Sequence, residues 1–167
     1  MRMTQASSRG AFAQARVARL ATVSAAGEPH VVPVTFAVID APVIDVRAER
    51  SLDEPPSDAS AVIAFAVDHK PKTTTALRRL DNIAANPRVA FLVDDYDEDW
   101  SRLWWVRADA DAIILSGDLR SLALTALTTK YAQYQQIPPN GVVVGATVLR
   151  WTGWQSSAGR IGVSPPP

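Results

Sequence analysis

Two β-branched segments flank a turn in the stretch ARLATVSAAGEPHVVPVTFAV, residues 18–38. The first segment covers residues 18–24 and the second covers residues 30–38, and the Ala-Gly-Glu-Pro sequence between them is rich in turn formers. The stretch therefore predicts a β-hairpin. Pro33 lies inside the second segment and cannot donate a ladder hydrogen bond, so we expect an edge, a bulge or the approach of another group there.

Further strands and two helices are expected along the chain. Apolar residues recur at helical spacing over residues 76–84, after Thr73, Thr74 or Thr75 as N-cap, and again from the N-cap Asp118 to Tyr131. Asp109 or Asp111 is expected to form a turn between two strands. Strand segments are expected at residues 43–46, 62–67, 89–93, 103–106, 112–115 and 142–149. This pattern favours a mainly β (α+β) antiparallel barrel with helices outside it.

The length of 167 residues fits one domain, which we place at residues 1–158 with a flexible tail at 159–167. Residues 1–12 are expected to be mobile, and the acidic, proline-rich residues 47–60 to form an exposed loop. The chain carries 17 basic and 17 acidic residues, and a formal net charge of zero argues against non-specific binding to nucleic acids or membranes.

The chain has no cysteine, which excludes disulfides and thiolate metal sites. Its two histidines lie far apart in the sequence, so we expect no metal site. No apolar run approaches the ~20 residues that span a bilayer, and the first residues lack the apolar core of a signal peptide. These features predict a cytoplasmic protein.

Basic residues gather in the stretch VDHKPKTTTALRRLDNIAANPRV, residues 67–89. Lys70 and Lys72 precede the expected helix, and Arg78 and Arg79 lie within it. The free N–H groups and positive dipole end of a helix N-terminus favour an anion, so the pattern indicates a phosphate or carboxylate site. A solvated helix face that balances the acidic loop is the other interpretation.

The chain resembles the pyridoxamine-phosphate-oxidase-like split-barrel flavoproteins, and more narrowly their deazaflavin (F420)-dependent branch. The resemblance runs from about Arg16 to Trp154 and depends on the joint occurrence of HKPKTTTALRRLDNIAANPRV and WSRLWWVR. It implies a homodimer of antiparallel six-stranded split β-barrels with two or more flanking helices. The cofactor, F420 or alternatively FMN, would lie in a groove at the dimer interface.

The resemblance also implies three groups of cofactor-binding residues. One strand lies along the ring, a basic helix with its preceding loop holds the phosphate and tail, and two residues come from the partner subunit. Plain barrel core is the other interpretation of the two valines in the strand. The residues are Val32, Pro33, Val34 and Thr35 for the ring; Lys70, Lys72, Thr73, Arg78, Arg79 and Asn82 for the phosphate and tail; and Trp100 and Ser101 from the partner.

The implied activity is hydride transfer from reduced F420 to a conjugated small-molecule acceptor, with a biliverdin-like tetrapyrrole or a quinone-like compound as candidates. The cofactor carries out the difficult step, so no catalytic side chain is assigned. One alternative is an FMN-dependent oxidase of the pyridoxamine-phosphate type. Such oxidases carry an Arg-x-His motif near the C-terminus, whereas this chain has no histidine after His69. A non-catalytic F420 carrier is the second alternative.

Overall fold

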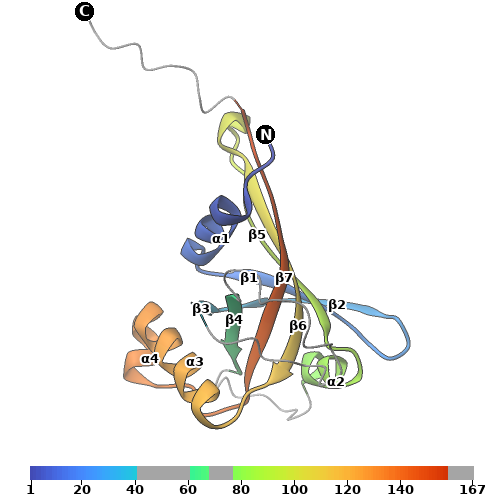
Figure 1. Ribbon diagram of the computed structural model, residues 1–167, viewed down its shortest axis with the longest axis vertical. Helices are drawn as coiled ribbons and strands as arrows, with labels where there is room; N and C mark the ends of the chain where they lie inside the picture. Colours follow the sequence, from blue (N-terminus) through green and yellow to red (C-terminus); the bar gives the residue numbers. More distant parts are fainter. Residues whose placement is uncertain (41–60, 68–76, 158–167) are drawn as a thin grey trace, which may run out of the picture.

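The computed structural model describes residues 1–40, 61–67 and 77–157. These residues form a seven-stranded antiparallel sheet in the order β2-β1-β5-β6-β7-β4-β3, with helices packed beside both its upper and its lower half (Figure 1). The strands are β1 (Ala18–Val23), β2 (Pro29–Val34), β3 (Ala37–Asp40), β4 (Ala61–Ala66), β5 (Arg88–Asp95), β6 (Trp104–Ile114) and β7 (Val143–Gln155). The helices are α1 (Gln5–Gln14), α2 (Arg78–Ala85), α3 (Gly117–Lys130) and α4 (Ala132–Gln136), with a short 3₁₀ turn, η1, at Trp100–Arg102.

Strands β2 and β3 are consecutive in the chain but lie at opposite edges of the sheet. Only Thr35 and Phe36 connect them, so the sheet has to curl until its two edges approach each other. Within the described residues, β2 and β3 form no ladder with each other. The result is a sheet of the split-barrel type that stays open at this corner.

The strand count differs from the expected six because residues 30–38 do not form one strand. The hydroxyl of Tyr131 accepts a hydrogen bond from the Phe36 N–H (3.0 Å) and lies 2.8 Å from the Phe36 carbonyl oxygen. These contacts divert the backbone of Phe36 from a ladder, and the segment breaks into β2 and β3.

The curled sheet encloses an apolar core. Strand β4 is buried at all six of its residues, and the aromatic rings of Phe65 and Phe91 meet inside the barrel at a centroid distance of 6.1 Å. A second cluster lies between β3, β4 and α3. Its fully buried members are Val62, Ala64, Ala123, Leu127 and Val143.

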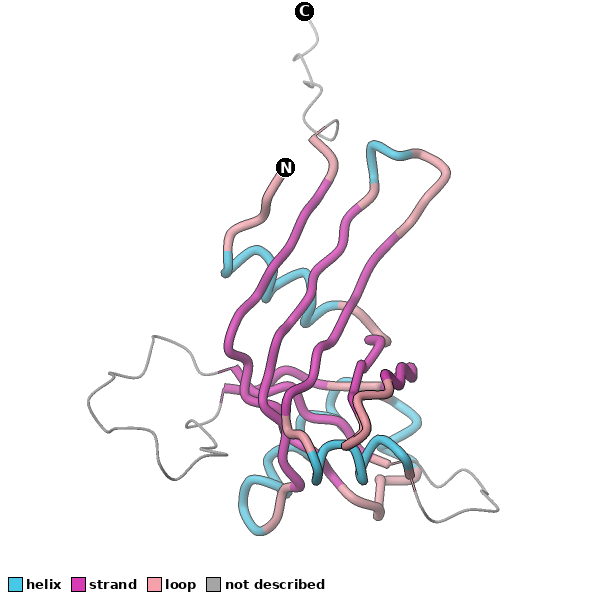
Figure 2. The backbone as a smooth tube through the Cα atoms, turned by 90° about the vertical axis from the view of Figure 1, so that its right-hand side faces the viewer, coloured by secondary structure: helices cyan, strands magenta, loops and turns pink. Residues whose placement is uncertain are grey.

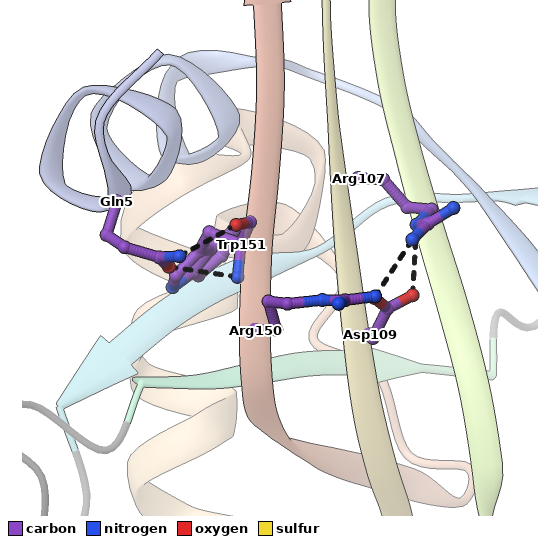
Figure 3. A network of polar contacts seen from close by, with 5 residues as sticks. All are labelled: Gln5, Arg107, Asp109, Arg150 and Trp151. Carbon is purple, nitrogen blue, oxygen red and sulfur yellow. Dashed lines mark hydrogen bonds and ion pairs between the residues drawn. The ribbon is translucent and has the colours of Figure 1, made fainter. Parts of the chain in front are cut away.

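Strands β5, β6 and β7 continue past the barrel as an arm with η1 at its tip (Figures 1 and 2). The N-terminal segment runs along the β7 side of this arm, where Met3 N–H donates to the Gly153 carbonyl (2.9 Å). The side chain of Gln5 then makes two hydrogen bonds to the backbone of Trp151 (3.0 and 3.1 Å; Figure 3). The segment therefore covers an edge of β7 that β4 does not reach.

The expected mobility of residues 1–12 stays a prediction, although most of these residues belong to α1, which Thr4 caps and which buries Phe12 against Trp151 (centroid distance 5.0 Å). One expectation about secondary structure is wrong. Asp109 and Asp111 were expected at a turn, but they lie within the single strand β6. The irregularity is instead in β7, where one extra residue bulges opposite Asp109 and Ala110.

The remaining elements agree closely with the sequence. The turn between β1 and β2 has Gly27 at φ 82°, a conformation that favours glycine. The N-cap of helix α3 is Ser116, two residues before the expected Asp118, and the helix ends at Lys130, directly before Tyr131. The strand expected at 43–46, the loop at 47–60, the candidate caps Thr73, Thr74 and Thr75, and the tail at 159–167 lie outside the described residues.

Candidate functional site

Helix α2 lies against the β1–β2 hairpin and is attached to it by two contacts of different character. The Asn82 Nδ2 donates to the Thr22 Oγ1 (2.9 Å), and both side chains are buried. Near the start of the helix, Arg78 forms an ion pair with Glu28 of the hairpin turn. The buried bond fixes the helix on β1, whereas the ion pair leaves a charged group at the helix start.

The N-terminus of α2 has an unfavourable charge pattern for a helix. Its N-cap is Leu77, whose side chain makes no capping hydrogen bond, and its first two residues are Arg78 and Arg79. Cations near the positive end of the helix dipole are destabilising, and Asp81 is the one acidic residue of this turn. Arg79 is partly buried, with its Nε shielded from solvent. An anion bound here would relieve the repulsion.

Strand β2 forms an edge of the described sheet, as one interpretation of Pro33 predicted. Val34 is buried and Val32 packs against the barrel core, so the core interpretation holds for both side chains. Pro33 points outward and is exposed. An edge strand leaves backbone N–H and C=O groups without ladder partners, and these are the groups that β2 offers to a ligand.

The basic helix α2 and the edge strand β2 lie close together at the hairpin end of β2. β2 starts beside Glu28, the partner of Arg78, and Val32 is four residues further on. At about 3.3 Å per residue, the two positions are ~13 Å apart along the strand. The structure thus brings Arg78, Arg79 and Asn82 together on α2, next to the hairpin that contains Val32 and Pro33.

Trp100 and Ser101 lie elsewhere in the same chain. They are in η1, at the tip of the arm and at the opposite end of the long axis from α2 (Figures 1 and 2). Trp100 is 78% exposed. Hydrogen bonds from Ser101 lower the pKa of Asp99, which caps the turn. One chain alone therefore does not bring the arm tip to α2, and Lys70, Lys72 and Thr73 lie outside the described residues.

A shallow groove of about 430 Å³ lies across the outer face of the sheet. Its charged side chains are paired within the chain: Asp109 binds Arg107 and Arg150 (3.0 and 2.9 Å; Figure 3), and Arg88 binds Asp111 (2.9 Å). This groove was not expected from the sequence, although the alternating Arg-Ala-Asp-Ala-Asp-Ala is typical of a strand with one polar face. The groove is lined by Ala21, Val23, Arg88, Val89, Ala90, Asp109, Ala110 and Arg150.

The corner between β2 and β3 contains a second cluster of polar contacts that the sequence did not reveal. The Lys130 Nζ donates to the carbonyl oxygens of Ala13 (2.9 Å) and Ala15 (2.7 Å) and lies 3.9 Å from the centre of the Phe36 ring. Burial, with a smaller effect from the charge of Arg16, lowers the pKa of Lys130 to about 8. Burial also raises the pKa of Tyr131.

In the described parts of the chain, no group of three or more histidine, cysteine, aspartate or glutamate side chains is placed to hold a metal ion. None of the helices in those parts is long and apolar enough to cross a membrane.

Solved structures with the same fold differ widely from this chain in sequence. A conserved hypothetical protein from Mycobacterium tuberculosis is 20% identical, with a TM-score of 0.66 over 99% of this chain and 93% of that one. A FAD-binding protein from Mesorhizobium loti is 18% identical, with a TM-score of 0.57 over 92% and 95%. A heme-binding protein from Mycobacterium smegmatis is also 18% identical, with a TM-score of 0.62 over 94% of this chain and 56% of that one.

Comparison with curated proteins gives no match. The model of the pyridoxamine 5'-phosphate oxidase family, however, matches residues 5–155, which include every described element of the barrel, the arm and the helices. The open antiparallel sheet and its flanking helices agree with that match. The chain belongs to the pyridoxamine 5'-phosphate oxidase family.

Proposed function

We propose that the protein is an oxidoreductase that binds the deazaflavin F420 and transfers a hydride to a conjugated organic acceptor. The observation that carries this proposal is the N-terminus of α2, where Arg78 and Arg79 follow an N-cap without a capping side chain. This arrangement suits an anionic ligand. The family supports a flavin-type cofactor, and FAD- and heme-binding proteins share the fold.

Arg79 is the proposed main contact of the cofactor phosphate, with Arg78 beside it. A charge-assisted hydrogen bond of this kind contributes about 1.5–3 kcal/mol. The ion pair between Arg78 and Glu28 does not block the site, because its side chains are 54% and 63% exposed. Such a surface pair contributes ~0–1 kcal/mol, so a phosphate can replace the carboxylate.

The preference for F420 over FMN follows from the number of basic residues. FMN carries one terminal phosphate, whereas F420 carries a phosphodiester followed by a glutamate tail. Lys70 and Lys72 precede α2 in the sequence and supply further positive charge for such a tail. Thr73 adds a hydroxyl donor, and Asn82 supports the helix through its bond to Thr22.

The ring is proposed to lie along β2, over Val32, Pro33, Val34 and Thr35. Free backbone groups of this edge strand would bind the polar edge of the ring, and the exposed Pro33 offers an apolar surface. When bound, reduced F420 supplies the hydride. The chain's own contribution is to bind and orient the cofactor and to exclude water, and no side chain of the chain is required to react.

A homodimer completes the proposed site. In this arrangement Trp100 and Ser101 of a second copy reach the cofactor that the first copy holds on α2 and β2. The exposure of Trp100 and of Tyr96, which is 70% exposed near the same tip, supports a partner for the arm. Sedimentation at micromolar concentration tests this part, and a monomer there would contradict it.

The cofactor is tested by titrating the purified protein with F420, FMN, FAD and heme side by side and following fluorescence or absorbance. We expect F420 to bind most tightly. FMN binding that is equal or tighter would favour the FMN-dependent oxidase. Tight F420 binding without reduction of biliverdin-like or quinone-like acceptors would favour a carrier.

A further inference from the structure

The corner between β2 and β3 has a problem of backbone hydrogen bonding. Phe36 is fully buried, yet it lies between two strands at opposite edges of the sheet and belongs to neither. Its N–H and C=O therefore have no ladder partner, and leaving such groups unsatisfied in a protein interior is costly. A side chain from outside the sheet has to satisfy them.

The hydroxyl of Tyr131 lies within hydrogen-bond distance of both groups. Its hydroxyl accepts from the Phe36 N–H (3.0 Å) and lies 2.8 Å from the carbonyl oxygens of Phe36 and Arg16. The hydroxyl has one proton, so it donates to one of these two carbonyl groups at a time. Tyr131 is 3% exposed, which leaves little room for water to take over its role. Its hydroxyl is the link between the open edge of β3 and the segment that leads into β1.

Tyr134 binds the neighbouring residue. Its hydroxyl lies 2.8 Å from the Thr35 Oγ1, and its ring meets that of Tyr131 at a centroid distance of 5.5 Å. The two tyrosines flank the start of α4 and contact the two consecutive residues that join β2 to β3. We call Tyr131, Tyr134 and these two residues the corner clasp.

We propose that Tyr131 and Tyr134 are positioning residues for the cofactor site. The clasp fixes the end of β2, and with it the backbone from Val32 to Thr35, before the cofactor binds. β2 has a single neighbour, β1, among the described strands, so its far end depends on such an anchor. Holding a binding strand in its bound geometry raises affinity because less order is lost on binding. This inference rests on the proposed function.

The first test compares Tyr134→Phe with Thr129→Val, a control that removes an exposed hydroxyl from the same helical region, where it bonds the Thr125 carbonyl. One neutral hydrogen bond contributes about 0.5–1.5 kcal/mol, which is roughly a two- to tenfold change in an equilibrium. We expect Tyr134→Phe to raise the Kd and KM for F420 by up to this factor, with kcat at saturating F420 unchanged and Tm lowered by a few degrees at most. The control should leave Kd, KM and kcat unchanged.

A double mutant tests whether Tyr134 acts through Thr35. In a Thr35→Val background, Tyr134→Phe should cause no further loss of affinity, because the bond it removes is already absent. A second full loss in that background would show that Tyr134 does not act through Thr35 and would overturn the inference.

A second measurement needs no cofactor. In Tyr131→Phe, hydrogen exchange of the Phe36 amide should accelerate by roughly tenfold or more, since the acceptor of this N–H is lost. Unchanged exchange would overturn the clasp. Wild-type protein that binds neither F420 nor a flavin would overturn the proposed function and this inference together. Normal wild-type binding with Tyr134→Phe equal to the control would overturn the inference alone.

Discussion

The two ends of β2 are held by opposite kinds of contact. At the hairpin end, Arg78 and Glu28 form an exposed ion pair, whereas at the corner end the hydroxyl of Tyr131 binds the buried backbone of Phe36. Exposed charge pairs contribute little to stability and exchange readily with ligands. Buried neutral hydrogen bonds leave unsatisfied groups behind when they are broken. One end is therefore suited to binding and the other to fixing geometry.

The largest expected effect is on cofactor affinity at the hairpin end. Arg79→Ala removes one charge-assisted phosphate contact of about 1.5–3 kcal/mol and should weaken F420 binding by roughly one to two orders of magnitude. The rate at saturating F420 should change little. Fluorescence titration and steady-state turnover measure the two quantities.

The conservative variant Arg79→Lys is the matched control. It should recover only part of the affinity, because an ammonium keeps the charge but lacks the planar fork that meets two phosphate oxygens. Intact affinity with abolished turnover in Arg79→Ala would make Arg79 catalytic. No change in either quantity would reduce it to part of a solvated helix face.

At the corner end the expected effect is on stability. Tyr131→Phe keeps the ring but leaves the N–H of Phe36 and one carbonyl unsatisfied, so the free energy of unfolding should fall by about 1–3 kcal/mol. Urea denaturation with an unchanged slope measures this loss. Arg78→Ala, at the hairpin end, should change stability by less than ~0.5 kcal/mol. Equal losses of unfolding free energy in the two variants would contradict the different roles assigned to the two ends of β2.

Lys130, which also belongs to the corner end, makes stability depend on pH. Burial lowers its pKa from the ordinary value of 10.5 to about 8 in the folded protein. Between these values the unfolded chain holds more protons, so stability should rise with pH from 8 towards 10.5. The slope should stay below the ~1.4 kcal/mol per pH unit of one full proton, because the side chain is partly solvated.

Denaturation between pH 8 and 9.5 tests this slope before tyrosine ionisation interferes. The raised pKa of Tyr131 acts in the opposite direction at higher pH, where the unfolded chain loses its phenolic proton first. Lys130→Met should flatten the rise. A variant with the same pH slope as the wild type would show that another group is responsible.

Regions defined by local interactions could be predicted from the sequence, whereas regions that depend on contacts between distant residues could not. The β1–β2 hairpin and α3 were predicted because turn residues and helical periodicity are local signals. α1 was missed because its sequence QASSRGAFAQ, with Gly10 in the middle, is a weak helix former. The helix is stabilised by distant contacts, such as the packing of Phe12 on Trp151 and of Ser8 on Gly153, where a Cβ would lie 2.5 Å from the Ser8 Oγ.

In the candidate site, too, local groupings could be predicted from the sequence and distant contacts could not. Arg78, Arg79 and Asn82 share one short helix, so their grouping was visible in the sequence. Asp109 and Asp111 were expected at a turn because aspartate is a common turn residue. Their arginine partners on neighbouring strands, up to 41 residues away, cannot be read from the local sequence. The bond between Tyr134 and Thr35 spans 99 residues, and no local pattern indicates it.

The smallest expected effect is on F420 affinity, and whether the affinity rises or falls distinguishes two roles of Glu28. Glu28→Gln removes the carboxylate that occupies Arg78 in the free protein, and because both side chains are more than half exposed, stability should change by less than ~0.5 kcal/mol. Affinity for F420 should nevertheless increase by a few-fold, since the phosphate no longer competes with an internal carboxylate. Raising the salt concentration should shrink the difference between variant and wild type, because screening weakens the internal pair. Weaker binding by Glu28→Gln would show that Glu28 orients Arg78 for the ligand, and the hairpin end would then be a positioning device like the corner.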